Sequence, residues 1–494
     1  MTDGSQLGPL PDVRGADLRF VLPRPPATVQ AVNARSRVAN SAFLEALAVA
    51  GVRQVDAAAD LVLATSRDID AVVRLAPEMA LLRGRARTAP LRAAGYHVQR
   101  FLVLPDQNHP RLLVPLTGRT AVIAALRRPP RNRVTRVSDV AAVALLSAGA
   151  SPASRTWTLA SRIGTAPWLL RAADDAGVDT SGAWFLWLGD GDALQRAVLH
   201  VLSSAGGCVV KFSRVPDNVV PFQREQDAAR LLRSLPHRLS EHTPTLLHQT
   251  IEQGLPVLVE RRLPGRSLHE VLTSDWPAKR RGRQIQLVAN WIHELAKATK
   301  VPPERLHQER LRLSGQVLPR WTDAALPAGS LASLVEVVER VPGVMQHNDL
   351  GTWNIVANGH GGFGVVDWES SRPVGLPLWD LLYFLVDAYT CRAGMQSVDR
   401  LAEALALLRG DHPDSSSLFA HVRRQVTTLD VEPSAVGALV TLGWLDHGLS
   451  AARRVRSLDE HTAGNPSATT SLQAALAPAW LHDPVLGAGW SAWR

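Results

Sequence analysis

Short apolar runs alternate with helix-like stretches over the first quarter of the chain. DLRFVLP, DLVLAT and VQRFLVLP have the length of buried strands, whereas SAFLEALAVAGV and IDAVVRLA have the spacing of helices with one apolar face. Such alternation is typical of an α/β unit with a mainly parallel sheet. We therefore predict an α/β domain over residues 1–125. A linker or helical connection over residues 126–180 should follow, since this part opens with a basic, proline-containing segment.

The pattern changes near residue 181. WFLWLG, RAVLHVL and CVVKFSR follow one another as short strand candidates and predict an antiparallel meander. A helix candidate, FQREQDAARLLRSL, comes next, and TLLHQTIEQG and PVLVERRL add two further strands. Beyond residue 277 the chain has mostly helical spacing, apart from a stretch around residues 345–367. The second part of the chain is therefore predicted to be α+β.

Composition narrows the class of protein. The 494 residues are 46% hydrophobic and 20% charged, which is typical of a globular protein with more than one domain. No run of about 18 uncharged apolar residues occurs and no signal-peptide pattern opens the chain, so we expect neither a membrane span nor a secreted protein. Two cysteines, Cys208 and Cys391, are too few for a disulfide framework. A cytoplasmic location is the expectation.

The net charge of +9 and the pI of 10.4 raise the question of a nucleic-acid partner. Only four of the 54 basic residues are lysines, and the arginines are dispersed along the chain. An arginine- and alanine-rich composition of this kind is typical of genome-wide codon bias. We therefore do not expect nucleic acid as a partner.

One polar stretch interrupts the apolar pattern near the middle of the helical region. It reads MQHNDLGTWNIV and contains His347, Asp349 and Asn354, and Asp367 follows 18 residues after Asp349 in VVDWE. Phosphoryl transfer needs a carboxylate that orients and deprotonates the attacking hydroxyl, and oxygen ligands that hold Mg²⁺ against the phosphates of ATP. Asp349 and Asn354 on one loop, with Asp367 after an apolar run, supply these groups.

Lys211 is a second candidate for this chemistry. It ends the apolar run CVVK in a chain with few lysines, and an ammonium on a flexible stem is suited to contact a phosphate. Glu225 lies 14 residues later in the helix candidate and could supply the counter-charge that a buried ammonium needs. Alternatively, Lys211 is a surface residue at a strand end and Glu225 an exposed helix charge.

Residues 181–460 resemble the aminoglycoside phosphotransferase and choline kinase family, relatives of the protein kinases. HNDLGTWN matches the catalytic-loop pattern H-x-D-x-x-x-x-N of that family, and VVDWE and GLPLWDL follow it in the family's order. The resemblance implies a bilobal, protein-kinase-like α+β fold, with a small antiparallel-sheet lobe over residues 181–262. A helical lobe over residues 263–494 would carry the acceptor-binding helices. It also implies ATP and Mg²⁺ as cofactors.

The resemblance assigns roles to the residues of the catalytic machinery. Asp349 would be the catalytic base, and Asn354 and Asp367 would be the metal ligands. Lys211 would bind the phosphates, with Glu225 as its ion-pair partner.

Other matched residues would support this machinery. His347 would hold the catalytic loop, and Asp380 in GLPLWDL would brace it from the start of a helix. Glu260 and Arg261, in the hinge strand of PVLVERRL, would lie near the adenine through their backbone groups.

The loop that covers the phosphates is reduced in this chain. LGDGDALQ offers Gly189 and Gly191 in place of G-x-G-x-x-G, and Gly-Asp-Gly also suits a plain hairpin turn. For the acceptor, Asp387 shares a helix face with Asp380 and is a candidate ligand, as is Asp446. Either carboxylate could instead cap a buried polar contact.

Two functions remain open at this point. The first is an ATP- and Mg²⁺-dependent phosphotransferase that acts on a hydroxyl of an aminoglycoside, sugar or amino alcohol. The alternative is a catalytically inactive kinase-like protein that binds nucleotide or acts as a scaffold. The N-terminal region weakly resembles the second half of S-adenosylmethionine-dependent methyltransferases but lacks their glycine-rich turn, so we expect a degenerate docking or substrate-presenting module there.

Overall fold

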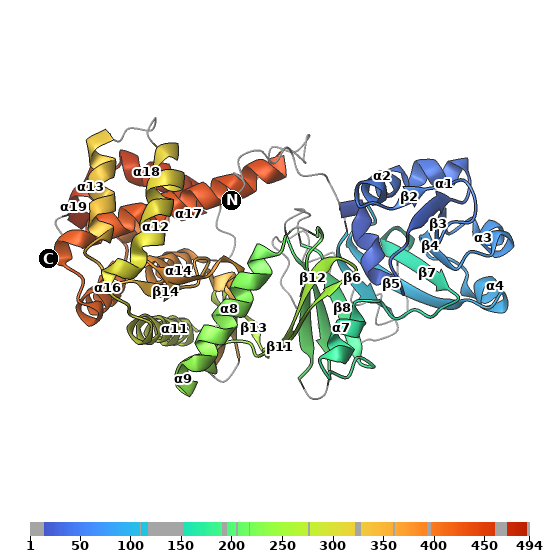
Figure 1. Ribbon diagram of the computed structural model, residues 1–494, viewed down its shortest axis with the longest axis horizontal. Coiled ribbons are helices and arrows are strands. Elements are labelled where there is room, and N and C mark those ends of the chain that lie inside the picture. The colour runs from blue at the N-terminus through green and yellow to red at the C-terminus, as the bar shows by residue number, and fades with distance from the viewer. Residues whose placement is uncertain are drawn as a thin grey trace. The chain divides into compact units, whose positions relative to one another are not determined.

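The chain divides into two units, which are described separately. The sheet unit comprises Met1–Phe222 and Thr245–Arg262, and the helical unit comprises Gln223–Pro244 and Leu263–Arg494. The structure, a computed structural model (Figure 1), describes residues 14–108, 110–116, 152–189, 195–203, 206–216, 218–274, 277–321, 328–358, 361–392, 397–459 and 472–491. Both units combine helices and strands, and the predicted α+β class is confirmed.

The strands of the sheet unit form one continuous sheet. In spatial order they are β11 (Leu246–Glu252), β12 (Leu255–Arg261), β10 (Cys208–Phe212), β9 (Ala197–Leu202), β8 (Ala183–Trp187), β6 (Pro110–Pro115), β5 (His97–Pro105), β7 (Thr156–Ser161), β4 (Met79–Arg83), β3 (Leu61–Thr65), β1 (Thr28–Ala31) and β2 (Arg53–Gln54). The predicted meander of β8, β9 and β10 is confirmed, because each neighbouring pair is antiparallel.

The N-terminal part of this sheet is parallel only at one end. β2, β1, β3 and β4 pair in parallel, whereas every pairing from β4 to β11 is antiparallel. The expectation of a mainly parallel sheet over residues 1–125 therefore holds for the first four strands but not for β5 and β6.

The expected linker over residues 126–180 contains a strand of this sheet. Thr156–Ser161 forms β7, which lies between β4 and β5 and is buried at all six positions. A strand buried on both faces carries no alternation of polar and apolar residues, so its sequence TWTLAS gives no periodic signal. The prediction of a linker is wrong for this segment.

Helices cover the two faces of the sheet. The N-terminal 3-10 helix η1 (Arg14–Val21), α2 (Ser41–Val49) and α7 (Leu170–Asp175) contribute to one core. α3 (Ile69–Leu75) and α4 (Thr88–Ala93) contribute to another, and the short helix α1 (Ala34–Ala39) precedes α2. The core under η1 includes side chains from β1 through β12, such as Leu63, Phe101 and Phe212. Sheet and core thus run without interruption across the boundaries predicted at residues 125 and 181.

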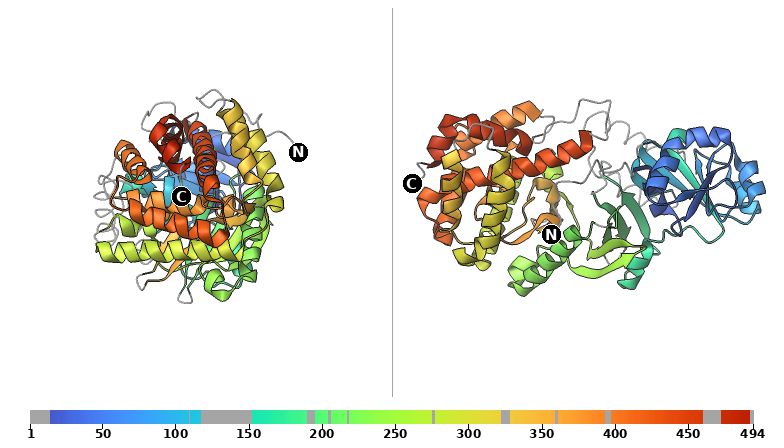
Figure 2. Two further views of the ribbon diagram at one scale, coloured as in Figure 1. Left: turned by 90° about the vertical axis from the view of Figure 1, so that its left-hand side faces the viewer. Right: turned by 45° about the horizontal axis from the view of Figure 1, so that its top comes forward.

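The helical unit is built around α14. Its helices are α8 (Val220–Ser234), α9 (His237–Ser240), α10 (Leu268–Leu272), α11 (Ala278–Ala298), α12 (His307–Arg312), α13 (Ala328–Val338), α14 (Trp379–Thr390), α15 (Ser397–Arg409), α16 (Ser415–Leu429), α17 (Val436–Asp459), α18 (Leu472–His482) and α19 (Pro484–Ser491). α14 is buried along nearly its whole length and packs against α11, α15, α16 and α17. α17 is the long orange-red helix of Figures 1 and 2.

Short strands complete the helical unit. β13 (Arg266–Ser267), β15 (Ile355–Ala357) and β16 (Phe363–Val365) form one small sheet, and β14 (Val344–Gln346) pairs with β17 (Arg372–Gly375). Among the described residues, no helix combines the length and hydrophobicity required to cross a bilayer.

A carboxylate joins two parallel strands at their carboxyl ends. Asp68 follows β3 and accepts hydrogen bonds from the Thr65 backbone amide at 2.9 Å and from Asn33 Nδ2 and Ser36 Oγ, which follow β1, at 2.9 and 2.7 Å. Burial alone would raise the pKa of Asp68, but the hydrogen bonds from Thr65, Ser36 and Asn33 outweigh it and lower the pKa to about 2.

Replacing Asp68 with asparagine should test this junction. Because the folded pKa lies below the ordinary value of 3.8, the charged carboxylate stabilises the fold above that value. The stabilisation is lost as the pH falls towards the folded pKa of about 2. We expect Asp68→Asn to lower the free energy of unfolding by about 1–2 kcal/mol at neutral pH, and by progressively less in acid. Urea denaturation of both proteins between about pH 5 and pH 2 measures this difference, and a pH-independent difference would contradict it.

Candidate active site

The segment after β14 forms a tight loop that begins at a buried histidine, His347. His347 has no exposed surface, and its Nε2 lies 2.9 Å from the backbone oxygen of Val366. Its ring also packs on Trp368, with centroids 4.6 Å apart. His347 therefore connects the loop to the segment that contains Asp367.

Asp380 holds the backbone of the same loop. It lies in the first turn of α14, and its carboxylate accepts hydrogen bonds from the amides of His347 at 2.6 Å and Asn348 at 2.8 Å. Asn348 has a positive φ of 64°, so the chain turns sharply just before Asp349. Burial raises the pKa of Asp380, against the opposing effects of His347 and the two amides.

Asp349 is partly exposed, and its carboxylate contacts the side chains of Tyr383 and Asn354. Its Oδ1 accepts a hydrogen bond from the hydroxyl of Tyr383 at 3.0 Å. Asn354 Nδ2 donates to the backbone oxygen of Asp349 at 2.8 Å and to its Oδ2 at 3.3 Å. The carboxylate of Asp349 is thus oriented from both sides.

Sequence reasoning missed Tyr383. Its position does carry a signal, because it lies three residues after Asp380 and therefore on the same face of α14. The same argument of helical spacing singled out Asp387 in the sequence.

A short hairpin brings Asp367 to Asn354. β15 and β16 pair antiparallel with Ile355 opposite Val365, and the Val366 amide donates to the backbone oxygen of Asn354 at 2.9 Å. Asn354 precedes one strand and Asp367 follows the other, so both lie at the open end of the hairpin. Asp367 has a left-handed conformation with φ 72° and ψ 58°.

Glu225 contacts the backbone of Trp368, the residue that follows Asp367. Its Oε1 accepts a hydrogen bond from the Trp368 amide at 3.3 Å, and its side chain is almost completely buried. The predicted ion pair between Glu225 and Lys211 joins residues of the two units, and it stays a prediction.

In the sheet unit, Lys211 is buried and pairs with Glu260. Lys211 Nζ lies 2.9 Å from Glu260 Oε2. Lys211 stands opposite Leu258 on β12, so Glu260, two residues along, projects from the same face of the sheet. The prediction for Glu260 concerned its backbone groups near the adenine and did not consider its carboxylate. Arg261 is exposed, and its amide donates to Thr245 O at 2.8 Å.

Gly189 ends the described part of the segment between β8 and β9. It has φ 67°, and a Cβ at this position would lie 2.4 Å from the side-chain amide of Gln195. The positive φ therefore favours glycine here, whereas the Gln195 amide ends a flexible side chain that could shift for a Cβ. Gly191 lies outside the described residues.

The two candidate acceptor ligands are buried in ion pairs. Asp387 accepts a hydrogen bond from the Thr352 amide at 2.7 Å and pairs with Arg400. Asp446 pairs with Arg312 at 2.7 Å and Arg372 at 2.9 Å.

The ion pairs argue against the expected role of Asp387 and Asp446 as acceptor ligands. Burial would raise the pKa of Asp446, but Arg372 and Arg312 outweigh it and hold the pKa well below its usual range. A buried carboxylate requires such partners, so the structure favours the alternative reading, in which Asp387 and Asp446 cap buried polar contacts.

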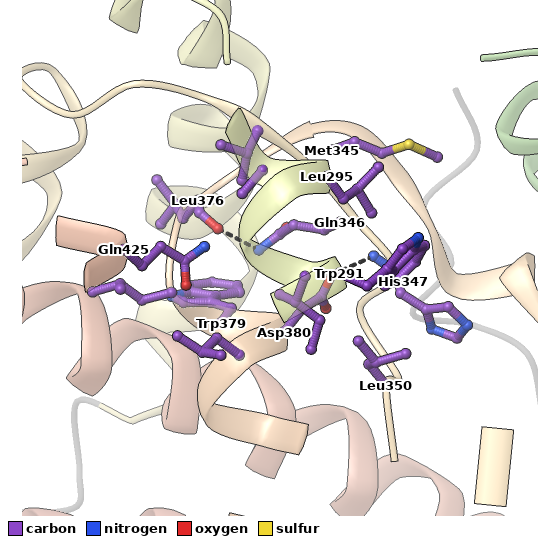
Figure 3. A pocket seen from close by; sticks show the side chains of 15 residues that line it. Trp291, Leu295, Met345, Gln346, His347, Leu350, Leu376, Trp379, Asp380 and Gln425 are labelled. Carbon is purple, nitrogen blue, oxygen red and sulfur yellow. Dashed lines mark hydrogen bonds between the residues drawn. The ribbon is translucent and has the colours of Figure 1, made fainter. Parts of the chain in front are cut away.

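A small cavity lies behind the loop (Figure 3). Its lining includes Trp291, His347, Asp380 and Gln425, and Gln346 Nε2 donates across it to Leu376 O at 2.7 Å. Its volume of about 10 Å³ is enough for one water molecule and too small for a substrate. The cavity belongs to the packing that supports the loop.

The metal site predicted here has few protein ligands. Among the residues that the structure describes, no three His, Cys, Asp or Glu side chains gather in a way that could hold a metal ion. Asn354 and Asp367 supply an amide oxygen and a carboxylate, which are hard oxygen donors of the kind that Mg²⁺ prefers when phosphates complete its shell.

Replacing Asp380 with alanine should destabilise the loop. It leaves the buried amides of His347 and Asn348 without their acceptor, and we expect the free energy of unfolding to fall by about 2–4 kcal/mol. Asp227→Ala, which removes an exposed carboxylate from α8, should change it by less than about 0.5 kcal/mol. Equal losses in chemical denaturation would contradict this account of Asp380.

Comparisons with known proteins agree with the loop motif. The family model described as the phosphotransferase enzyme family matches residues 189–419. Comparison with curated protein sequences finds no match.

Two solved structures resemble parts of the chain at low similarity. One, from Ralstonia eutropha JMP134 and provisionally described as an aminoglycoside phosphotransferase, has a TM-score of 0.41 and 14% identity, covering 65% of this chain and 96% of its own. The other, an aminoglycoside-3'-phosphotransferase of type VIII, has a TM-score of 0.32 and 17% identity, covering 52% and 90%. The family match spans Lys211, Asp349 and Asp367, so residues 189–419 of this chain are similar to the phosphotransferase enzyme family.

Proposed function

We propose that this protein transfers the γ-phosphoryl group of ATP, bound with Mg²⁺, to a hydroxyl group of a small molecule. The observation that carries the proposal is the oriented carboxylate of Asp349, held between Tyr383 and Asn354 inside a segment that matches a phosphotransferase family. Sugars, amino alcohols and aminoglycosides are the acceptor classes to consider, since each carries hydroxyl groups.

Asp349 would act on the acceptor. Its partial exposure leaves room for a hydroxyl to approach, and the contacts with Tyr383 and Asn354 restrict its rotation. It would accept a hydrogen bond from the hydroxyl and orient the oxygen towards the phosphorus. It would take up the proton as the new O–P bond forms and the bond from the γ-phosphorus to the oxygen of the leaving ADP breaks. Because the carboxylate is already fixed, little entropy is lost at this step.

Asn354 and Asp367 would hold the metal. Asn354 Nδ2 is directed to Asp349, so the amide oxygen is the atom of this side chain that could coordinate a cation. When bound, Mg²⁺ would neutralise charge on the phosphates. The hydrogen bond from Asn354 to Asp349 would then couple the metal side of the site to the acceptor side.

Lys211 would neutralise further phosphate charge. Its ammonium is buried on β10 beside Glu260, which offsets the cost of burying the charge and restricts its position. The predicted contact of Glu225 with Lys211 would add a second carboxylate to this ammonium.

An assay with labelled ATP tests the proposal. We expect transfer of the γ-phosphate to at least one hydroxylated compound from a panel of sugars, amino alcohols and aminoglycosides in the presence of Mg²⁺. Asp349→Asn keeps the shape of the side chain but removes the base, and it should lower kcat by about 10²–10⁴ with little change in the affinity for ATP. Asp227→Asn is the matched control and should retain full activity.

The same assay distinguishes the phosphotransferase from the alternative, a catalytically inactive protein that binds nucleotide. Binding of ATP without labelling of any acceptor would favour a nucleotide-binding scaffold. Transfer that survives Asp349→Asn unchanged would remove Asp349 from its proposed role.

The acceptor side of the loop carries an exposed aromatic residue. Trp353 is 40% exposed, and its indole lies over Gly351, where a Cβ would be 2.3 Å from the ring. The ring of Tyr383 lies nearly perpendicular to the indole, with ring centroids 6.2 Å apart and an interplanar angle of 78°. A flat apolar surface fixed in this way, close in the chain to Asp349, would suit the C–H face of a sugar ring or a cationic amine.

Substitutions of Trp353 test this contact. Trp353→Ala should raise the KM for the acceptor by about tenfold, while the KM for ATP stays unchanged, because only the acceptor would contact the indole. Trp353→Phe keeps an aromatic face and should retain most of the affinity. Steady-state kinetics with each substrate varied in turn measures both constants, and an unchanged acceptor KM in Trp353→Ala would exclude the contact.

A further inference from the structure

A buried arginine follows the strand that carries Lys211. Arg214 has a fully buried side chain, and its Nε donates to both carboxylate oxygens of Asp17, at 3.0 and 3.1 Å. One terminal nitrogen donates to the backbone oxygen of Gln195 at 2.6 Å, and the other donates to that of Leu188. Each of the three guanidinium nitrogens thus donates a hydrogen bond to a protein acceptor.

These acceptors come from three separate elements. Asp17 lies on η1, at the N-terminal end of the described chain. Leu188 follows β8 and Gln195 precedes β9, so they flank the reduced glycine segment that contains Gly189. Arg214 therefore ties η1 to both ends of the segment that would cover the nucleotide phosphates.

η1 also supports β10 from the face opposite Lys211. Phe20 of η1 packs on Phe212 with ring centroids 4.6 Å apart. Arg19 donates to the backbone oxygen of Arg214 at 2.7 Å. Since neighbouring residues of a strand project to opposite faces, Phe212 fixes the strand from behind while Lys211 projects from the other side.

We infer that Asp17 and Arg214 are positioning residues for the nucleotide, and that η1 is a required part of the nucleotide site. This inference rests on the proposed function. It differs from the expectation of a docking or substrate-presenting module, because a contact of η1 with both ends of the glycine segment would act on ATP and not on the acceptor.

The charge of Asp17 is what makes the contact specific. A buried guanidinium without its carboxylate has an uncompensated charge, and the side chain then moves towards water or the surrounding structure opens. In either case the backbone oxygens of Leu188 and Gln195 lose their shared donor. Leu188 and Gln195, the described ends of the glycine segment, would then no longer be held to the strand that carries Lys211.

The experiment compares ATP binding in two variants of the full-length protein. Asp17→Asn should weaken the binding of Mg²⁺·ATP by at least about tenfold in isothermal titration calorimetry, and the KM for ATP should rise while that for the acceptor is unchanged. A general loss of stability would not raise the KM for ATP while leaving the KM for the acceptor unchanged. Binding of ATP with wild-type affinity by folded Asp17→Asn would overturn the inference.

Asp60→Asn is the matched control. Asp60 is also a paired carboxylate of the sheet unit, with Arg24 at 2.9 Å and the Thr28 amide at 2.9 Å, but it lies beside β1 and β3. We expect this variant to lose thermal stability and to keep its affinity for ATP. An equal loss of ATP affinity in Asp60→Asn and Asp17→Asn would show a general effect of destabilisation and would overturn the inference.

Arg214→Lys covers the case in which Asp17→Asn does not fold. Lysine keeps the positive charge beside Asp17 but lacks the planar fork that reaches Leu188 and Gln195 together. It should therefore fold, as measured by circular dichroism, and bind ATP at least about fivefold more weakly. Wild-type affinity in Arg214→Lys would overturn the inference, whereas wild-type protein that binds no ATP would instead overturn the proposed function.

Discussion

The helical unit depends on polar side chains placed along one buried helix. α14 lies in the centre of its core, so every polar group on it needs a partner. Asp380, Tyr383 and Asp387 follow one another at spacings of three and four residues, and each binds a successive part of the loop. Asp380 accepts from the amides that precede Asp349, Tyr383 donates to Asp349 itself, and Asp387 accepts from the amide of Thr352. The conformation of the loop is thus set by the pitch of a helix.

Much of this site could be predicted from the sequence, because its contacts are local. His347, Asp349 and Asn354 lie within eight residues, and a single hairpin brings Asp367 to them. The carboxylate beside Lys211 could not be predicted, because Glu260 reaches it only through the register of two strands about 50 residues apart in the chain. Spacing along α14 correctly placed Asp387 on the face of Asp380, but spacing does not say whether a carboxylate on that face meets water or a backbone amide.

The single sheet was also beyond sequence reasoning. The junction between its two parts is the pairing of β6 with β8, which uses backbone hydrogen bonds that any residue can make. The alternation of strands and helices before residue 125 therefore indicated a separate domain, although its apolar faces are shared with the strands that follow. Asp17 and Arg214 gave no signal either, because they lie almost 200 residues apart and neither belongs to a motif.

The position of β7 sets an order on the assembly of the chain. β7 separates β4 from β5, although β5 and β6 precede it in the sequence. During synthesis, the hairpin of β5 and β6 therefore has no neighbour on the β4 side until Ser161 has left the ribosome. Over that interval β4 and β5 both present open edges, which other chains can pair with. The insertion of one six-residue strand therefore closes both edges at once.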